Sequence, residues 1–473
     1  MNRKMILTLP LILLTQATLA IDPPGIMWTR AYYEGENSGF YHVIEAADGG
    51  FVLAGYQQDA GGQPSENCLF KTDTNGNLLW NTGLGWYSQS AKWIEQLDDG
   101  GFIAVGSGKL LATSSYSLFM VRTDAEGTIL WIQNYDNPSS TEDGYCVTQL
   151  PDSGYAVCGR VNGSGTYLGQ AWVLRTDADG DTLWTRIWGQ HTVNDARRIV
   201  YQNGLLHVLT YGKINPDSAS GVHLVTWDLD GNFLDEVRIP ELNGQGMDMC
   251  YCPWDGGYTI VTKGTISREI AHVDGQGSLL WRVATSSDGY SISTTMDGDY
   301  IYGGQKIIFG SDSEYRGRVV LFGPDGDQLW EDWIYELNCM AIYSIRQLSQ
   351  GGYIAAGISM VSGPNNCAQL IRYAPETGID EGITPQHNSS LAAPVPNPSA
   401  GGFSISFSLP ADGPANLAVY DLAGRRVTEL YEGTATTGEH SLAWDTGDLP
   451  SGCYIVMLRT EEGVQSRNCV LIR

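Results

Sequence analysis

The histidines are the first residues to test for chemistry, and they are scattered along the chain: His42, His191, His207, His223, His272, His387 and His440. None lies in an HExxH pattern or in another spacing typical of metal ligands, and there is no GxSxG segment for a nucleophilic serine. A single histidine in a strand is more often a hydrogen-bonded structural residue than a ligand. We therefore expect no metal, no cofactor and no catalytic set from sequence motifs alone.

Acidic turns are the second candidates. Asp177, Asp179 and Asp181 belong to a DADGD segment, and residues 73–77 spell DTNGN. An EF-hand loop needs Gly at position six and a bidentate Glu at position twelve, whereas DADGD has Gly at position four and Trp at position twelve. An Asp that bonds its own backbone, followed by a Gly with positive φ, is typical of a tight hairpin turn. We interpret both segments as turns.

These turns belong to a pattern that recurs about every 50 residues, a period that predicts a solenoid, a propeller or an array. A typical copy has a strand that begins at Gly, a polar loop, a second strand, a tight turn and a strand with Trp near its start; Asp235 stands where Trp is expected in one copy, and the last copy ends without a Trp. The copies are Gly50–Trp80, Gly101–Trp131, Gly154–Trp184, Gly204–Asp235, Gly257–Trp281, Asp299–Trp330 and Gly352–Asp380. With the segment before each Gly, every copy supplies four short antiparallel strands.

One such small sheet cannot bury both of its faces, but sheets stacked radially bury one another. The tryptophans then fill the wide outer gap between neighbouring sheets as core residues: Trp28, Trp80, Trp131, Trp184, Trp281 and Trp330. Trp188, four residues after Trp184, has no evident counterpart in most repeats, so we expect it to matter less. Trp28 precedes the first repeat, so residues 26–33 are expected to pair with the last sheet (residues 341–373) and close the ring.

The first strand of each repeat should line a central channel. Its polar residues are candidates for a ligand site: His42, Glu45, Lys92, Glu95, Arg197, Arg198, Asp248 and Arg346. Their charges are mixed, so they predict neither a phosphate cradle nor a cation funnel. The set fits solvated channel walls as well as a ligand site, and carboxylates from different repeats could still meet there.

Nine cysteines in an exported chain allow disulfides. Cys146 and Cys158 flank one predicted turn, and Cys453 and Cys469 flank another, so each pair is a candidate disulfide; the alternative is that they are small buried side chains. Cys250 is two residues from the next cysteine on the same strand, which makes them poor partners.

The ends of the chain indicate export. Residues 1–20 have the form of a signal peptide, with Arg3 and Lys4 before an apolar run and a cleavage site after Ala20. The apolar run is too short to span a bilayer and no second one follows, so we expect no transmembrane span in the mature chain. A net charge of −26 argues against a nucleic-acid partner, and no polybasic cluster favours an anionic membrane.

A change of composition separates the last part of the chain. Residues 381–393 are rich in Pro, Ser and Asn and predict a linker. Residues 394–473 contain short alternating strands with Gly and Asp turns at the spacing of a β-sandwich.

The repeats resemble seven-bladed propellers of the broad quinoprotein-like, BamB-like group, in which the third strand also ends in Asp-x-x-Gly and a Trp follows. This resemblance covers residues 26–380. It implies a fold rather than a function, because the group includes enzymes, assembly factors and binding scaffolds. No vicinal cysteine pair or other convincing ligand set for a quinone is present.

The last domain resembles the type A C-terminal sorting domain of the type IX secretion system. The similar segments are Pro396–Pro398, Val419–Asp421 with Gly424 and Arg425, Gly438–His440, Trp444–Asp445 and Leu449–Tyr454. It is also similar to the Ig-like domain of flagellar-hook capping proteins. In the sorting family this domain is recognised by outer-membrane secretion machinery and carries the protein across the outer membrane. The alternative is a plain Ig-like spacer.

The sequence thus predicts an all-β protein: a seven-bladed β-propeller plus a C-terminal Ig-like β-sandwich. Its expected parts are a signal peptide (1–20), the propeller (21–380, closed by strand 26–33), the linker (381–393) and the sorting domain (394–473). We expect a bacterial protein, secreted or at the cell surface, that binds a glycan or a protein or serves as a scaffold. The alternative is an enzyme with its site at the central channel, either a polysaccharide hydrolase or lyase or a quinoprotein.

Overall fold

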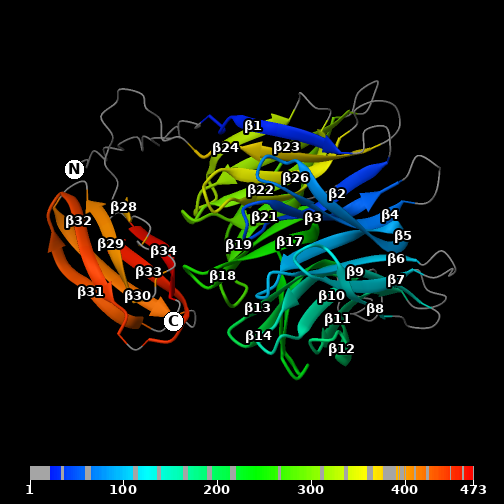
Figure 1. Ribbon diagram of the computed structural model, residues 1–473, viewed down its shortest axis with the longest axis horizontal. Helices are drawn as coiled ribbons and strands as arrows, with labels where there is room; N and C mark the ends of the chain where they lie inside the picture. The colour runs from blue at the N-terminus through cyan, green and yellow to red at the C-terminus, as the bar shows by residue number, and fades with distance from the viewer. Residues whose placement is uncertain are drawn as a thin grey trace, which may run out of the picture.

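The computed structural model describes residues 22–376 and 390–471, with short gaps between strands. The gaps are residues 33–36, 59–64, 110–115, 136–139, 163–168, 189–193, 213–219, 265–267, 309–313, 335–338, 360–365, 392–393, 395–398, 400, 410–411, 422–425, 448 and 461–462. The expected signal peptide, with Ala20, and most of the expected linker lie outside the described residues. Within them the regular structure is entirely β-strand (Figure 1). The described part therefore contains no helix able to span a bilayer.

Most strands belong to one large body of short antiparallel sheets (Figure 1). Its strands are β1 (Ile26–Tyr32), β2 (Ser38–Glu45), β3 (Phe51–Gln57), β4 (Glu66–Thr72), β5 (Leu78–Gln96), β6 (Phe102–Lys109), β7 (Ser117–Thr123), β8 (Ile129–Tyr135), β9 (Thr141–Gln149), β10 (Tyr155–Asn162), β11 (Gly169–Thr176), β12 (Thr182–Trp188), β13 (Asp195–Gln202), β14 (Leu205–Gly212), β15 (Gly221–Asp228), β16 (Phe233–Ile239), β17 (Gln245–Cys252), β18 (Gly257–Lys263), β19 (Glu269–Val273), β20 (Leu279–Ala284), β21 (Asp288–Thr294), β22 (Tyr300–Ile308), β23 (Glu314–Phe322), β24 (Gln328–Ile334), β25 (Cys339–Gln347), β26 (Tyr353–Ser359) and β27 (Cys367–Tyr373).

These strands repeat one unit of four, ordered from an innermost to an outermost strand. Five sheets have four strands each, and the sixth joins β2 to β8 through the 19-residue β5. The two ends of β5 belong to two neighbouring units. The described part of the chain therefore contains seven units in the ring. The innermost strands β2, β5, β9, β13, β17, β21 and β25 contact one another in this order, and β25 contacts β2. The units therefore form a closed ring.

Strand β1 joins the two ends of this ring. It pairs antiparallel with β27, with Trp28 opposite Arg372 and Tyr32 opposite Ala368. The last unit thus takes its outermost strand from the start of the chain, which is the pairing expected from the position of Trp28. Without β1, the edge of β27 would be left unpaired.

The Asp-x-x-Gly turns form as their chemistry requires. Asp177 Oδ1 accepts hydrogen bonds from the backbone N–H groups of Asp179 at 3.0 Å and Asp181 at 2.9 Å. Gly180 has φ +83°, a conformation that costs other residues energy. The carboxylate of Asp177 is therefore used by its own turn, as the hairpin interpretation predicts.

Five of these turn glycines also meet the tryptophan of the preceding unit, and we call this the Trp-on-glycine contact. A Cβ atom on Gly127 would lie 2.9 Å from the Trp80 ring, and one on Gly326 would lie 2.7 Å from Trp281. The indole N–H often completes the contact: Trp184 Nε1 donates to the Leu229 carbonyl at 2.9 Å. The pairs are Trp28 on Gly76, Trp80 on Gly127, Trp131 on Gly180, Trp184 on Gly231 and Trp281 on Gly326. Where Asp235 replaces Trp, Gly277 meets Val237 instead.

The tryptophans are less buried than the sequence suggested. Trp330 is 1% exposed, but Trp28, Trp80, Trp131, Trp184 and Trp281 are half-buried, because one ring face lies on the turn and the other is nearer solvent. Trp188 is expected to matter less because it has no evident counterpart in most repeats, but that premise is wrong. Its side chain is 8% exposed, and its indole N–H donates to Glu236 at 3.0 Å. Tyr32 and Tyr135 occupy the same position, four residues after a tryptophan, and are also buried.

The C-terminal body is a two-sheet structure that Figure 1 shows beside the ring. One sheet has the order β28-β29-β32 and the other β31-β30-β33-β34. Its strands are β28 (Ser390–Leu391), β29 (Gly402–Leu409), β30 (Gly413–Asp421), β31 (Arg426–Ala435), β32 (Gly438–Asp445), β33 (Gly452–Thr460) and β34 (Gly463–Leu471). Leu391 pairs with Phe407 and is buried in the core between the sheets. The linker expected over 381–393 therefore ends before Ser390.

The two candidate cysteine pairs have different geometry. Cys146 and Cys158 are direct cross-strand partners on β9 and β10, both buried and both free thiols in this structure. In the C-terminal body, Cys469 is opposite Tyr454, whereas Cys453 is opposite Val470. The two cysteines are therefore offset by one residue, and a disulfide between them stays a prediction.

The Trp-on-glycine contact can be tested with a pair of matched variants. Gly127→Ala and Gly100→Ala both place a side chain at positive φ, +82° and +86°, but only at Gly127 does the new Cβ meet a tryptophan. Each should lose about 1–2 kcal/mol from the backbone conformation, and Gly127→Ala about 1–3 kcal/mol more from overpacking. Thermal unfolding of the two variants measures the difference. Equal melting temperatures would show that the contact does not stabilise the ring.

Candidate functional site

Every innermost strand contains at least one extra residue relative to its neighbour, a β-bulge. In β2, for example, Phe40 pairs with Gly55 and His42 with Ala54, so Tyr41 has no partner residue. A bulge re-aims a side chain and is common beside functional sites. The strands β5 and β25 each have a second irregularity nearer their pairing ends. We call one extra residue from each innermost strand the bulge ring: Tyr41, Lys92, Tyr145, Arg197, Met247, Tyr290 and Tyr343.

The bulge ring surrounds the axis on which the seven units converge. Tyr145 is 8% exposed and the other six side chains are half-buried, so water reaches most of the bulge ring. Adjacent members touch: the Tyr41 and Tyr343 rings are 4.9 Å apart, and so are those of Tyr343 and Tyr290. We call the bulge ring, together with Asp143, Arg160, Asp195 and Lys263 around it, the axial site.

One half of the axial site is charged. The Tyr145 ring lies between two cations, with Lys92 Nζ at 5.0 Å and Arg197 Cζ at 4.1 Å from its centroid. Arg197 pairs with Asp195 at 2.8 Å, and Arg160 pairs with Asp143 at 2.9 Å and with Asp195 at 3.4 Å. Burial alone would raise the pKa of Asp143, but Lys92 and Arg160 outweigh it and lower that pKa. Asp143 is therefore held as a carboxylate.

The other half is an arc of tyrosines. Tyr56, Tyr41, Tyr343 and Tyr290 follow one another with centroid separations of 6.1, 4.9 and 4.9 Å. Lys263 Nζ lies 5.1 Å from the Tyr290 ring. Aromatic faces with phenol hydroxyls offer an apolar body and a polar tip, a combination suited to rings that carry hydroxyl groups.

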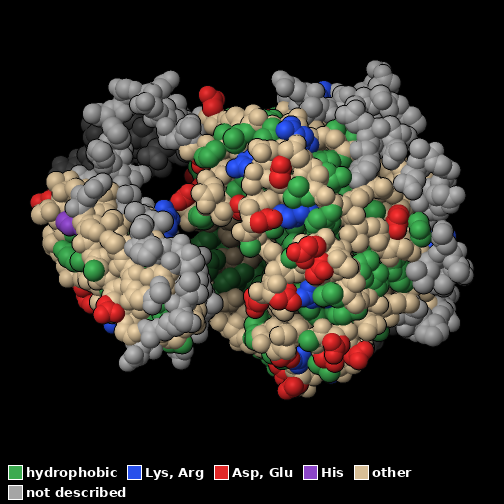
Figure 2. Space-filling view, in the orientation of Figure 1, with side chains coloured by type: hydrophobic (Ala, Val, Ile, Leu, Met, Phe, Trp, Pro, Cys, Tyr) green, Lys and Arg blue, Asp and Glu red, His purple; other side chains and the backbone are tan. Residues whose placement is uncertain are grey.

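The charge of the axial site differs from that of the whole chain. Acidic side chains are spread over the face shown in Figure 2, as the net charge of −26 predicts. At the axis, however, the cations Lys92, Arg160, Arg197, Lys263 and Arg268 gather around the carboxylates Asp143, Asp195 and Asp288. Because the chain has only 27 Lys and Arg against 53 Asp and Glu, this is a local concentration of positive charge, which attracts anions.

Below the bulge ring, a buried layer closes the axis. Trp93 is 8% exposed and lies between the His42 ring, at a centroid separation of 3.6 Å, and Arg198 Cζ, at 3.8 Å. Arg198 also donates to Cys146 Sγ at 3.0 Å and lies 3.5 Å from Asp248. These packed side chains form a buried layer, which we call the floor, next to the bulge ring.

His42 is held neutral in this floor. Arg346 Nη2 lies 3.0 Å from its Nε2, and the backbone N–H of Ile94 is 3.4 Å from its Nδ1. Both neighbours are donors, which disfavours a protonated ring. Burial, followed by the charges of Arg346 and Arg198, lowers the His42 pKa well below its ordinary value.

The structure brings most of the predicted channel residues together in layers. Lys92 and Arg197 are in the bulge ring, while His42, Arg198, Asp248, Glu95 and Arg346 are in or next to the floor. Burial raises the pKa of Glu95, although Arg198 opposes the shift. Glu45 is elsewhere: it accepts from the backbone N–H of Ser349 at 2.7 Å and ties the first unit to the last.

The tyrosines of the axial site, Trp93, and the Asp143 and Asp195 carboxylates are not among the residues predicted from the sequence. A signal was present, because Tyr41, Lys92 and Tyr145 all precede the Gly that starts the next strand of their repeat by nine residues. Aligning the repeats on that Gly would have placed them in one ring. The bulge itself could not be foreseen, since it arises from the pairing of the strands.

Residues 395–472 match the family model of the secretion system C-terminal sorting domain. The matched segment coincides with the C-terminal body, and such a domain marks a protein that is secreted or displayed at the cell surface. No curated protein is significantly similar to this chain.

Solved structures similar to the chain include several β-propellers. The β-propeller domain of Cps50 (Swd1) from Myceliophteria thermophila is 10% identical with a TM-score of 0.49, over 74% of this chain and 100% of that chain. The Dos1 propeller is 10% identical with a TM-score of 0.48, over 76% and 96%. The propeller domain of the Trilobed protease from Pyrococcus furiosus is 9% identical with a TM-score of 0.44, over 71% and 93%. The closed ring of antiparallel sheets makes the chain an all-β protein with a β-propeller, and the family match adds a C-terminal sorting domain.

The neutral His42 makes the stability of the ring depend on pH. A histidine with a depressed folded pKa contributes stability above the unfolded pKa of about 6.5, and this is lost as pH falls toward the folded pKa. Wild type should therefore lose stability between pH 7.5 and 5.5 relative to His42→Gln, which keeps an acceptor for Arg346, by about 1 kcal/mol or more. Denaturant unfolding at the two pH values measures this, with His440→Gln in the C-terminal body as the control. An equal pH response in wild type and His42→Gln would contradict the neutral, buried state.

Proposed function

We propose that this protein is an exported binding protein whose ring captures an acidic carbohydrate at the axial site. The observation that carries the proposal is the bulge ring, which aims one side chain from every unit at one place. If packing alone decided the strand pairing, the seven innermost strands would not all need a bulge at the same position. A binding role at the axis gives all seven bulges the same purpose.

The chemistry of the axial site supports an acidic sugar. The tyrosine arc offers flat apolar faces with hydroxyl tips for sugar rings, and Lys92, Lys263 and Arg197 offer cations for carboxylate or sulfate groups. The positive local charge would also draw such a ligand toward an otherwise acidic protein. Electrostatic attraction of this kind weakens as salt increases.

Binding is a better interpretation than hydrolysis. A glycosidase needs one carboxyl group that stays protonated near neutral pH and a second that is ionised. Asp143 and Asp195 are both paired with arginines, and the pKa of Asp143 is lowered rather than raised. Among the described residues of the axial site, these carboxylates serve to hold the arginines in place.

The finer architecture is part of the same proposal. We interpret the seven units as seven blades of a quinoprotein-like, BamB-like propeller, and the C-terminal body as an Ig-like domain similar to that of flagellar-hook capping proteins. The sorting domain is assigned to type A. In this proposal the chain enters the export route through a signal peptide cleaved after Ala20, and outer-membrane secretion machinery then recognises residues 390–473.

Export can be tested by moving the C-terminal body. Removing residues 390–473 in a host with the type IX system should leave a folded ring in the periplasm, because the ring buries its core within its own units. Fusing those residues to an unrelated periplasmic protein should bring that protein to the surface. Protease accessibility on intact cells is the readout, with a periplasmic marker as control. Surface display of the truncated protein would leave an Ig-like spacer as the better interpretation.

Ligand binding can be tested on a glycan array and then by calorimetry. The full mature chain should bind acidic oligosaccharides better than their neutral counterparts, and binding should weaken with salt. Tyr343→Ala and Lys263→Ala should each lower affinity about tenfold, the scale of a contact worth about 1.4 kcal/mol. Trp254→Ala, which removes an exposed aromatic residue from the turn at the far end of β17, is the matched control. Unchanged affinity in both axial variants would place the ligand elsewhere on the protein.

A further inference from the structure

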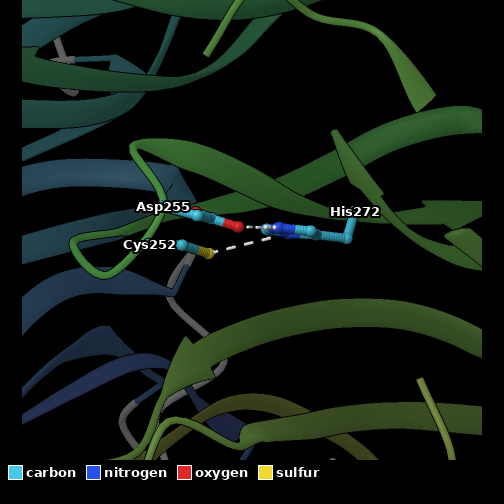
Figure 3. A group of neighbouring side chains, drawn as sticks. All are labelled: Cys252, Asp255 and His272. Atoms are coloured by element: carbon cyan, nitrogen blue, oxygen red, sulfur yellow. Dashed lines mark hydrogen bonds and ion pairs between the residues drawn. The ribbon is translucent and has the colours of Figure 1, made fainter. Parts of the chain in front are cut away.

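The unit of β17–β20 contains a second cluster of chemically active side chains, away from the axial site. Cys252 ends β17, Asp255 lies in the turn before β18, and His272 is on β19. Figure 3 shows Cys252 and Asp255 pointing toward the same imidazole ring. The two side chains inside the sheet are almost inaccessible: Cys252 is 0% and His272 is 3% exposed.

The distances define the donor set. Asp255 Oδ2 lies 2.6 Å from His272 Nε2, and Cys252 Sγ lies 3.8 Å from His272 Nδ1. The Thr259 hydroxyl is 2.9 Å from Nδ1 and 3.4 Å from Sγ. Since a carboxylate only accepts, Asp255 places a proton on Nε2. In the neutral ring, Nδ1 therefore presents its lone pair toward the thiol.

Other units show what the fold itself requires here. Asp48 pairs with Lys71 at 2.6 Å, Asp99 pairs with Arg122, and Asp152 pairs with Arg175, all between the same turn and the same strand position. The Asp255–His272 pair occupies this place in the β17–β20 unit. A lysine or an arginine thus satisfies the structural role, and neither has a free lone pair when charged.

The thiol and the hydroxyl are equally unnecessary for packing. In two other units, Leu97 and Leu150 occupy the position of Cys252. Each of these leucines is buried where the innermost strand meets the turn. Two residues after the Gly that begins the next strand, Thr259 corresponds to Ile103 and Ala156. Compared with these units, the β17–β20 unit therefore has a thiol, a hydroxyl and an imidazole in place of two apolar residues and a cation.

We propose that Cys252 and His272 bind one thiophilic d¹⁰ cation, Zn²⁺ or Cu⁺, with Asp255 as the carboxylate that orients His272. Zinc bonds of about 2.3 Å to sulfur and 2.0–2.1 Å to imidazole nitrogen can bridge atoms that are 3.8 Å apart. A carboxylate on the second nitrogen of a ligating histidine is the usual outer partner at such sites. The ion takes the place of one proton. This proton is on the Cys252 sulfur when the pair is neutral and on His272 Nδ1 when the pair is a thiolate and an imidazolium, so one proton is released for each ion bound.

One further feature concerns access to this site. The Asp255 side chain is 34% exposed, so the carboxylate next to His272 Nε2 reaches the surface.

The test uses the full mature chain, reduced and freed of metal with a chelator. Titration with Zn²⁺ and, separately, with Cu⁺ held by a competing chelator should show one ion bound per chain and one proton released. Cys252→Leu and His272→Arg copy the other units and should each weaken binding at least tenfold while keeping the melting temperature near that of wild type. Cys339→Ala removes a different buried thiol and should leave binding unchanged. The arm with the tighter binding identifies the ion.

A spectroscopic probe keeps the proposal testable even if the variants unfold. Co²⁺ added to wild type should give a thiolate-to-cobalt charge-transfer band, and Zn²⁺ or Cu⁺ should abolish it. The proposal is overturned if wild type binds neither ion in a one-to-one ratio, if no charge-transfer band forms, or if His272→Arg binds as tightly as wild type. Those results would leave an unmetallated thiolate–imidazolium pair that serves only the packing of this unit.

Discussion

The Trp-on-glycine contact is the interaction on which the rest of the ring depends. A tight turn needs a glycine because its φ is positive, and the absence of a side chain then leaves a flat place on which the tryptophan of the preceding unit lies. One residue thus serves the local turn and the contact between units. Where the tryptophan is missing, at Asp235, Val237 takes its place against Gly277. More than one type of side chain can therefore pack on the turn glycine.

A ring held together at its outer strands leaves the innermost strands free to vary. All seven keep a bulge at the same position, but the side chains there range from tyrosine to lysine, arginine and methionine. The same division explains the Cys252 cluster, where one unit departs from a pattern that lysine or arginine satisfies in others. Stability is carried by what the repeats share, and chemistry by the positions at which they differ.

The sequence predicted the repeat, the four-stranded unit, the tight turns and the pairing of residues 26–33 with the last sheet, because each follows from local residue types at a fixed spacing. It predicted the axial residues only in part. His42, Arg198 and Asp248 were assigned to the channel, but Tyr41 and Tyr343 were missed, since a bulge depends on the register of two strands. Register also offsets Cys453 and Cys469 by one residue, a detail that the position of the turn alone does not specify. Likewise, Trp188 was undervalued because burial depends on the neighbouring unit, where it bonds Glu236.

Native-state hydrogen exchange of Trp184→Ala tests the central claim most directly. If each tryptophan holds the turn of the next unit, the variant should exchange faster at residues 228–232, which belong to the neighbouring unit, as well as along β12. Units on the far side of the ring should lose protection to the same extent as one another, because a ring opened at one contact unfolds more readily as a whole. Faster exchange confined to β12 would show that the tryptophan stabilises only its own strand, and would contradict the account.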